Sequence, residues 1–183
     1  EKWTLPSPNI FTYALAISTC ARCGKSDEVL LLFDQMSTTQ SNSLNTTIAP
    51  FTWVYNKALL ACVESCHSSK LRRSKGFNLA TAMSILEKME ADATAGCGNS
   101  APDVESYNSV LAMLGQRILL EAKKIKLKEG HKTRRLSEFT SNDDIVNDIL
   151  ITMQRQGINR NAETYSNAIS ACFAQPKEIL TLF

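Results

Sequence analysis

The chain has 183 residues, of which 44% are hydrophobic, and its formal net charge is +2. This composition excludes an intrinsically disordered chain, and the length suits one domain or a short array of repeats. No run of 18 apolar residues is present, which excludes a membrane-spanning helix. The sequence begins at Glu1 with no targeting leader, so we expect a fragment or a processed product.

The first predicted element is a helix from about Asn9 to Arg22. Residues 1–8 hold two prolines and look like the tail of a preceding segment, Asn9 is a suitable N-cap, and Gly24 suits the helix end. A second helix begins at Ser26 with acidic residues in its first turn, where they favour the helix dipole. Its apolar stripe is Val29, Leu30, Leu32, Phe33 and Met36. The first 36 residues therefore predict two antiparallel helices joined by a short turn.

A second pair of helices is predicted after Pro50. The first of them covers about residues 51–65, and a basic insert at 67–75 separates it from the second, which follows Gly76. The apolar stripe of that second helix is Leu79, Ala82, Met83, Ile85, Leu86 and Met89. The spacing of these residues places them on one helix face.

The third pair differs from the others in its long basic insert at 117–140. Its first helix starts after Asp103, and Gly115 is only a weak breaker, so the residues after it either extend the helix or fold back. We expect Ser141 to Asp144 to cap the next helix. Its stripe is Ile145, Val146, Ile149, Leu150 and Met153.

The first helices of all four predicted pairs share one pattern. Each holds a Tyr, followed by small or branched apolar residues at three and four positions, and by Cys or Leu at seven. The Tyr residues are Tyr13, Tyr55, Tyr107 and Tyr165, and the residues at the seventh position are Cys20, Cys62, Leu114 and Cys172. The pattern predicts an all-α array with repeats at 9–51, 52–103 and 104–161 and a partial repeat at 162–183. A lone half-repeat exposes its apolar face, so we expect more chain or a partner beyond it.

The six cysteines leave two interpretations open. Cys20 and Cys23, and Cys62, Cys66 and His67, have nearly the local spacing of metal ligands. A Cys that alternates with Leu in a repeat, however, behaves as a small hydrophobic residue, so we expect core packing, no metal and no cofactor. We also expect no enzyme, because the chain has only two histidines, both in inserts without a recurring partner.

The stretch from Val146 to Ser166 resembles a pentatricopeptide repeat (PPR), running from a second helix into the next first helix. The stretches from Ile10 to Met36, from Leu86 to Met89 and from Pro102 to Asn108 fit the same pattern. The resemblance covers nearly all of residues 9–174 apart from the inserts, and it implies a right-handed α-solenoid. Family repeats hold about 35 residues, whereas the Tyr-to-Tyr spacings here are 42, 52 and 58.

The resemblance also implies that each repeat reads one base of single-stranded RNA with two side chains. These are the residue after the Tyr and the last residue before the next repeat. The pairs are Ala14 with Phe51, Asn56 with Asp103, and Asn108 with Asn161, and Ser166 stands without a partner. The second pair resembles a uracil reader and the third a cytosine-leaning one, which implies a weak pyrimidine bias. The alternative interpretation is that Asn and Asp at these positions cap helices.

Two further sets of residues bear on RNA binding. Phe11 and Trp53 occupy the position that wedges between bases, although they can equally pack between helices. Glu105 and Glu163 at the same position disfavour contact with a polyanion. Of the 20 Lys and Arg residues, 12 lie in the two inserts, where they can bind phosphates or simply be solvated. The candidate phosphate-binding residues are Arg22, Lys70, Arg72, Arg73, Lys123, Lys124, Lys126, Arg134 and Arg135.

The resemblance thus predicts a single-stranded RNA-binding array in the RNA metabolism of a mitochondrion or plastid such as a chloroplast. We expect no membrane partner and no small-molecule substrate. The alternative is a structural or scaffolding subunit of a larger organellar ribonucleoprotein or protein assembly, with other proteins as partners. The long inserts, the two acidic wedge positions and the repeat without a hydrogen-bonding pair favour this alternative.

Overall fold

The computed structural model describes residues 8–23, 25–38, 51–67, 79–96, 99–127 and 140–172. These residues form seven α-helices and no strands, which confirms the all-α prediction for this part of the chain. The helices are α1 (Ile10–Arg22), α2 (Ser26–Thr38), α3 (Thr52–His67), α4 (Leu79–Thr94), α5 (Val104–Leu127), α6 (Thr140–Arg155) and α7 (Ala162–Ala171). None of these helices is long and apolar enough to cross a membrane.

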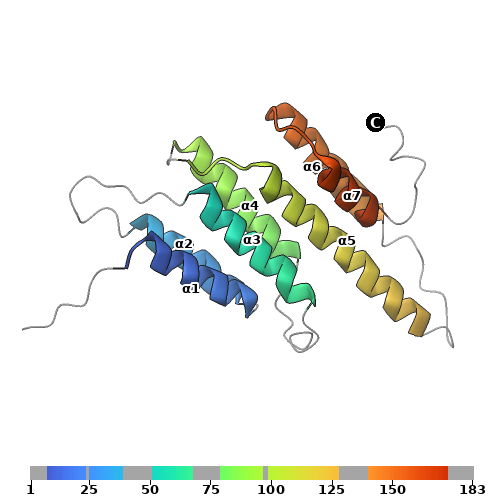
Figure 1. Cartoon of the computed structure of the whole chain (residues 1–183), viewed down its shortest axis with the longest axis horizontal. Coiled ribbons are helices and arrows are strands. Elements are labelled where there is room, and N and C mark those ends of the chain that lie inside the picture. The colour runs from blue at the N-terminus through green and yellow to red at the C-terminus, as the bar shows by residue number, and fades with distance from the viewer. Residues whose placement is uncertain are drawn as a thin grey trace, which may run out of the picture. The chain divides into compact units, whose positions relative to one another are not determined.

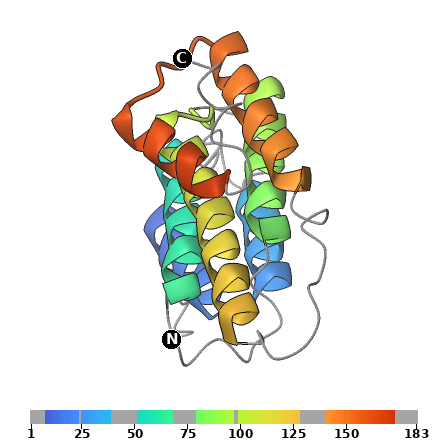
Figure 2. The same ribbon diagram turned by 90° about the vertical axis from the view of Figure 1, so that its right-hand side faces the viewer.

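The chain divides into two compact units, Glu1–Pro102 with α1 to α4 and Asp103–Phe183 with α5 to α7. In the first unit, α1 packs against α2 and α3, and α3 packs against α4. Two views show α1 and α3 in one layer of this unit and α2 and α4 in a second layer (Figures 1 and 2). In the second unit, α5 packs against both α6 and α7. The first helices α1 and α3 therefore pack together, and so do α5 and α7.

Three of the four first helices start with the same polar cap. The capping side chain accepts hydrogen bonds from the backbone N–H and from the hydroxyl of the residue three positions on, over 2.8–3.0 Å. The capping residues are Asn9, Asp103 and Asn161, and the hydroxyl residues are Thr12, Ser106 and Thr164. Such a cap contributes about 1 kcal/mol. The structure thus confirms the predicted cap at Asn9 and the capping interpretation of Asp103 and Asn161.

The turn between α6 and α7 depends on a glycine. Gly157 has a φ of 69°, a left-handed conformation that costs glycine little. Its N–H donates to the carbonyl of Gln154 over 3.1 Å, and the N–H of Ile158 donates to the carbonyl of Met153 over 2.9 Å. This is the Schellman arrangement that ends a helix. It ends the second helix of the third pair shortly before the fourth first helix begins.

Helix α5 answers the question that the sequence left open at Gly115. The helix runs without a break to Leu127, so residues 117–127 of the predicted insert continue it. Gly115 lies where α7 approaches: a Cβ atom there would be 3.1 Å from the Cβ of Ser170. The glycine therefore serves close packing and does not break the helix. The remainder of the insert, up to residue 139, lies outside the described residues.

The start of α6 differs from the sequence-based prediction. Ser141 to Asp144 do not precede a helix, because α6 already begins at Thr140, and this places them in its first turns. Within the extended part of α5, Leu119 is exposed, whereas its neighbour Ile118 is buried. Successive side chains of an α-helix point about 100° apart, so neighbouring residues can face the core and the solvent.

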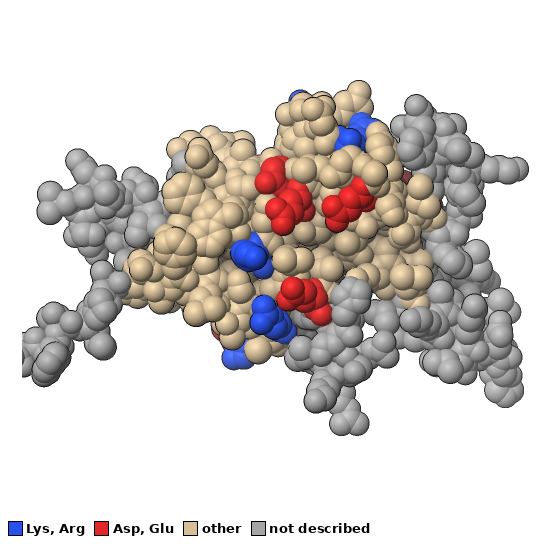
Figure 3. Space-filling view, viewed as in Figure 1, with Lys and Arg blue, Asp and Glu red and all other residues tan. Residues whose placement is uncertain are grey.

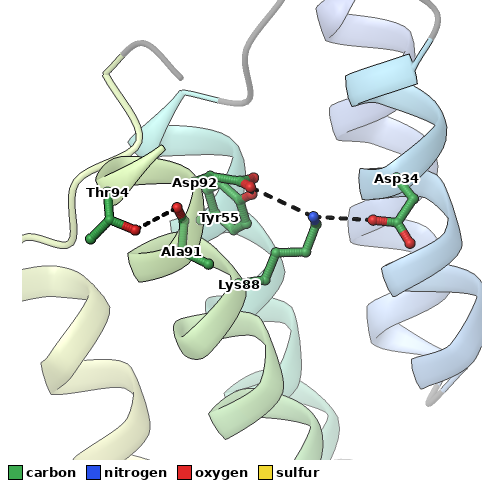
Figure 4. A network of polar contacts seen from close by, with 6 residues as sticks. All are labelled: Asp34, Tyr55, Lys88, Ala91, Asp92 and Thr94. Atoms are coloured by element: carbon green, nitrogen blue, oxygen red, sulfur yellow. Dashed lines mark hydrogen bonds and ion pairs between the residues drawn. The ribbon is translucent and has the colours of Figure 1, made fainter. Parts of the chain in front are cut away.

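The core of the first unit is centred on a stacked aromatic pair. The rings of Phe33 in α2 and Tyr55 in α3 lie 4.4 Å apart at an interplanar angle of 8°. The hydroxyl of Tyr55 donates a hydrogen bond to Asp92 near the end of α4. Lys88 bonds both Asp34 in α2, over 3.1 Å, and Asp92, over 3.7 Å (Figure 4). The network therefore joins α2, α3 and α4.

The second unit repeats part of this arrangement. The hydroxyl of Tyr107 in α5 donates to the amide oxygen of Gln156, just after α6, over 2.9 Å. Tyr107 thus bonds to the end of α6 as Tyr55 bonds to the end of α4 in the first unit. The repetition of this contact explains why the Tyr recurs in the sequence.

Candidate nucleic-acid interface

Helices α1 and α3 are parallel, and equivalent positions of the two repeats meet. Near their starts, the rings of Phe11 and Trp53 have centroids 5.8 Å apart. Near their ends, Nε of Arg22 lies 3.5 Å from Oε2 of Glu64. Each of these pairs is separated by 42 residues, which is also the spacing from Tyr13 to Tyr55. The contacts therefore follow the repeat that the sequence predicts.

An exposed apolar strip covers the first helices of this unit. Phe11 is 70% exposed and Leu15, one turn further along α1, is 71% exposed, while Trp53 in α3 is 38% exposed. Lys57 and Leu60 follow Trp53 at spacings of four and seven, so they share its helix face, and both are exposed. We call these five residues the α1–α3 face. It is a surface that can accept planar apolar groups.

The two rings of the α1–α3 face already touch each other. A centroid separation of 5.8 Å and an angle of 34° describe a tilted aromatic pair in direct contact. No third ring fits between Phe11 and Trp53 at this distance. A base would have to stack on the outer surface of the pair.

Three of the seven positions expected to read bases are buried, and two others, Asp103 and Asn161, are the helix caps described above. Asn56 is 5% exposed, Asn108 is 4% exposed, and Ala14 is buried as well. Phe51 and Ser166 are exposed. Hydrogen bonding to a base requires an accessible polar edge, so the burial of the two Asn side chains limits what they can contact.

Asn108 has a specific reason to be buried. Its Oδ1 accepts the hydroxyl of Thr164 over 2.7 Å, and its Nδ2 donates to Oδ1 of Asn161 over 3.2 Å. Its backbone carbonyl accepts the side chain of Asn167 over 3.2 Å. The two side chains that the resemblance assigns to base reading, Asn108 and Asn161, are thus hydrogen-bonded to each other. In this structure the amide fastens α5 to the start of α7.

Charge is distributed unevenly along the chain. Among the side chains that the structure describes, there are 13 Asp and Glu but only seven Lys and Arg. The seven are Arg22, Lys25, Lys57, Lys88, Arg117, Arg155 and Arg160. On the face shown in Figure 3, described residues of both signs are scattered among uncharged surface. The helices themselves therefore present no uniformly basic surface there.

The structure places only part of the predicted phosphate-binding set. Arg22 is exposed and paired with Glu64. The side chains of Lys123, Lys124 and Lys126 in α5, and all of Lys70, Arg72, Arg73, Arg134 and Arg135, lie outside the described residues. Glu105 and Glu163 are exposed. Sequence reasoning missed Leu15 and Lys57, although both stand two residues after the recurring Tyr.

Cysteine packing is confirmed in part. Cys62 is fully buried and donates to the carbonyl of Ala58 over 3.0 Å, and Leu114 at the equivalent position is buried too. Cys20 and Cys172 are only half-buried. Within the described ranges, no three His, Cys, Asp or Glu side chains gather as metal ligands do. Burial, reinforced by the neighbouring carboxylate of Asp143, raises the pKa of Cys172 to about 12.

This raised pKa predicts unequal cysteine reactivity. At pH 8 we expect iodoacetamide to alkylate the exposed Cys23 at least about ten times faster than Cys172. The thiolate is the reactive form, and the raised pKa of Cys172 lowers its thiolate fraction. Mass spectrometry of peptides from timed samples measures both rates. In urea the burial that disfavours the Cys172 thiolate is lost, so its rate should rise toward that of Cys23. Equal rates in the folded protein would contradict the packing of Cys172 against Asp143.

Comparison of the sequence with protein-family models found no match, and a search of curated proteins found no significantly similar sequence. A functional assignment therefore depends on the residues and their geometry. Two features matter most for it. The first is the exposed pair Phe11 and Trp53, and the second is the internally bonded Asn108.

Proposed function

We propose that this chain is a PPR-like α-solenoid that binds single-stranded RNA on the α1–α3 face, in the RNA metabolism of a mitochondrion or plastid. The observation that carries the proposal is the pair of exposed aromatic rings of Phe11 and Trp53. They come from equivalent positions of two repeats and meet on adjacent parallel helices. Stacking of a base on such a ring contributes about 1–3 kcal/mol and tolerates any sequence, because every base has a π-face.

The exposure of these rings supports binding more than core packing. Large apolar side chains scattered singly on a surface are ordinary, but here two exposed aromatic rings touch, and Leu15 and Leu60 are exposed on the same helix faces. Lys57 lies on the same helix face as Trp53, where its ammonium group can meet a backbone phosphate. The Lys and Arg residues of the segments 67–75 and 117–140 add positive charge to the chain, which would strengthen attraction to RNA.

A second candidate function is a structural subunit of a larger assembly. The inward position of Asn108 favours it, because a repeat whose reading amide is engaged internally contributes packing instead of base recognition. The excess of acidic side chains on the described helices favours it as well, since carboxylates repel phosphates. Under this alternative, the α1–α3 face docks a protein partner.

Binding of fluorescently labelled single-stranded RNA to the full chain, measured by anisotropy at two salt concentrations, tests the proposal. Phe11→Ala should weaken binding about 5- to 100-fold, the equivalent of losing one stacked base. Leu31→Ala is the matched control: it removes an exposed apolar side chain from α2, away from the α1–α3 face, and should leave the Kd unchanged. Absence of binding at low salt would reject RNA binding and leave the scaffold as the remaining candidate.

A further inference from the structure

We infer that the α1–α3 face selects its RNA by stacking strength, so that it prefers purine-rich over pyrimidine-rich single strands. This inference rests on the proposed RNA binding and specifies the class of ligand. It differs from the weak pyrimidine bias that the family resemblance implies. The reason lies in which side chains the fold exposes and which it buries.

The first step is the position of the hydrogen-bonding groups. In the second unit, both polar atoms of the Asn108 amide are engaged with Asn161 and Thr164. In the first unit, Asn56 is buried and Ala14 has no polar side chain. None of these three positions offers an accessible polar edge to a base. Discrimination by hydrogen bonds is therefore weak at these three positions, and the exposed hydroxyl of Ser166 is the polar group left at the equivalent place of the fourth repeat.

The second step is the shape of the aromatic surface. Because Phe11 and Trp53 touch, a base covers both rings from outside and does not enter between them. Stacking free energy grows with the apolar area that is removed from water. A bicyclic purine covers more of a two-ring platform than a monocyclic pyrimidine does. Leu15 extends the platform by one helix turn, which suits the larger base.

The third step concerns the phosphate. Lys57 lies one turn beyond Trp53 on the same helix face, and it is exposed. A single ammonium group at this place neutralises one phosphate of the stacked nucleotide. Each such contact makes the slope of log K against log salt more negative by about 0.7 for a single strand. The α1–α3 face therefore has an apolar platform with one cation at its edge.

The test compares labelled A12, C12 and U12 oligoribonucleotides with the full chain by anisotropy. A12 should bind about 3- to 10-fold more tightly than the two pyrimidine strands, given the spread of stacking contributions. The measured ratio of affinities is a lower limit on the stacking preference of the protein, because A12 must lose part of its own base stacking when it binds. Phe11→Leu keeps apolar volume but removes the ring, and it should weaken the binding of A12 more than that of C12 and U12, so that the preference for A12 is lost. Lys57→Gln should reduce the salt slope for all three strands equally.

The outcomes separate this inference from the proposed function. Tighter binding of C12 or U12 than of A12, or equal binding that Phe11→Leu leaves unchanged, overturns selection by stacking while RNA binding stands. Failure of all three strands to bind at low salt overturns both. Ser166→Ala serves as a further control, because it removes the exposed position expected to read a base and should leave the order of affinities intact.

Discussion

Replacement of Phe33 by alanine is expected to lower the free energy of unfolding of the first unit by about 3–5 kcal/mol. The side chain is fully buried and stacks on Tyr55 at a centroid distance of 4.4 Å. Removing it leaves a cavity beside Tyr55, whose hydroxyl is fixed by Asp92. The surrounding helices cannot close that cavity without disturbing the network around Lys88. Urea denaturation followed by far-ultraviolet circular dichroism measures the loss.

The matched control for Phe33 lies two residues away on the same helix. Leu31 in α2 is exposed, so Leu31→Ala should change stability by no more than about 0.5 kcal/mol. Both substitutions have the same effect on helix propensity to within a few tenths of a kcal/mol. A loss below about 1 kcal/mol for Phe33→Ala would mean that the aromatic stack does not form the core of this unit.

Asn108→Ala is expected to lower the free energy of unfolding of the second unit by about 1–3 kcal/mol, because it removes two side-chain hydrogen bonds between α5 and the start of α7. The hydroxyl of Thr164 loses one of its two acceptors and keeps Oδ1 of Asn161, which in turn loses one of its three donors. Both partners sit at the start of α7, so the packing of α7 against α5 weakens as well. Thermal unfolding followed by circular dichroism measures the effect.

A double-mutant cycle sharpens this prediction. Thr164→Val alone should also be destabilising. The double variant should lose less stability than the sum of the two single losses, because both substitutions remove the same hydrogen bond between Thr164 and Asn108. Ser166→Ala, at the position equivalent to Asn108 in the next repeat, is exposed and should be nearly neutral. If Asn108→Ala left stability unchanged and reduced RNA binding, Asn108 would be a base reader and the bonded network would not describe the protein in solution.

The sequence was most informative where one residue determines a local event. An Asn or Asp followed three residues later by Thr or Ser marks the start of a helix, and the structure shows that start after Asn9, Asp103 and Asn161. The recurring Tyr likewise marked a core position: its ring is buried in the second and third repeats. Local chemistry and helical periodicity suffice for such predictions.

Sequence reasoning was weaker where the environment comes from distant residues. The position after the Tyr holds Asn56 and Asn108, and spacing alone did not indicate whether these face solvent or a neighbouring helix. For Asn108 the answer depends on Asn161 and Thr164, which are 53 and 56 residues further along the chain. Leu15 and Lys57 escaped notice because comparison of repeats favours positions at which the residue type recurs. Their importance comes from exposure, which the fold determines.

The pairing of helices within each unit also bears on how fast the chain folds. The helix pairs in extensive contact, such as α1 with α2, α1 with α3 and α5 with α7, are adjacent or next but one in the sequence. Folding rates rise as contacting residues become closer along the chain, so such a topology favours rapid assembly, hairpin by hairpin. A longer connection slows this only slightly, because doubling a loop adds about 0.6 kcal/mol to its closure. Long inserts can therefore grow between the helices without making the chain a slow folder.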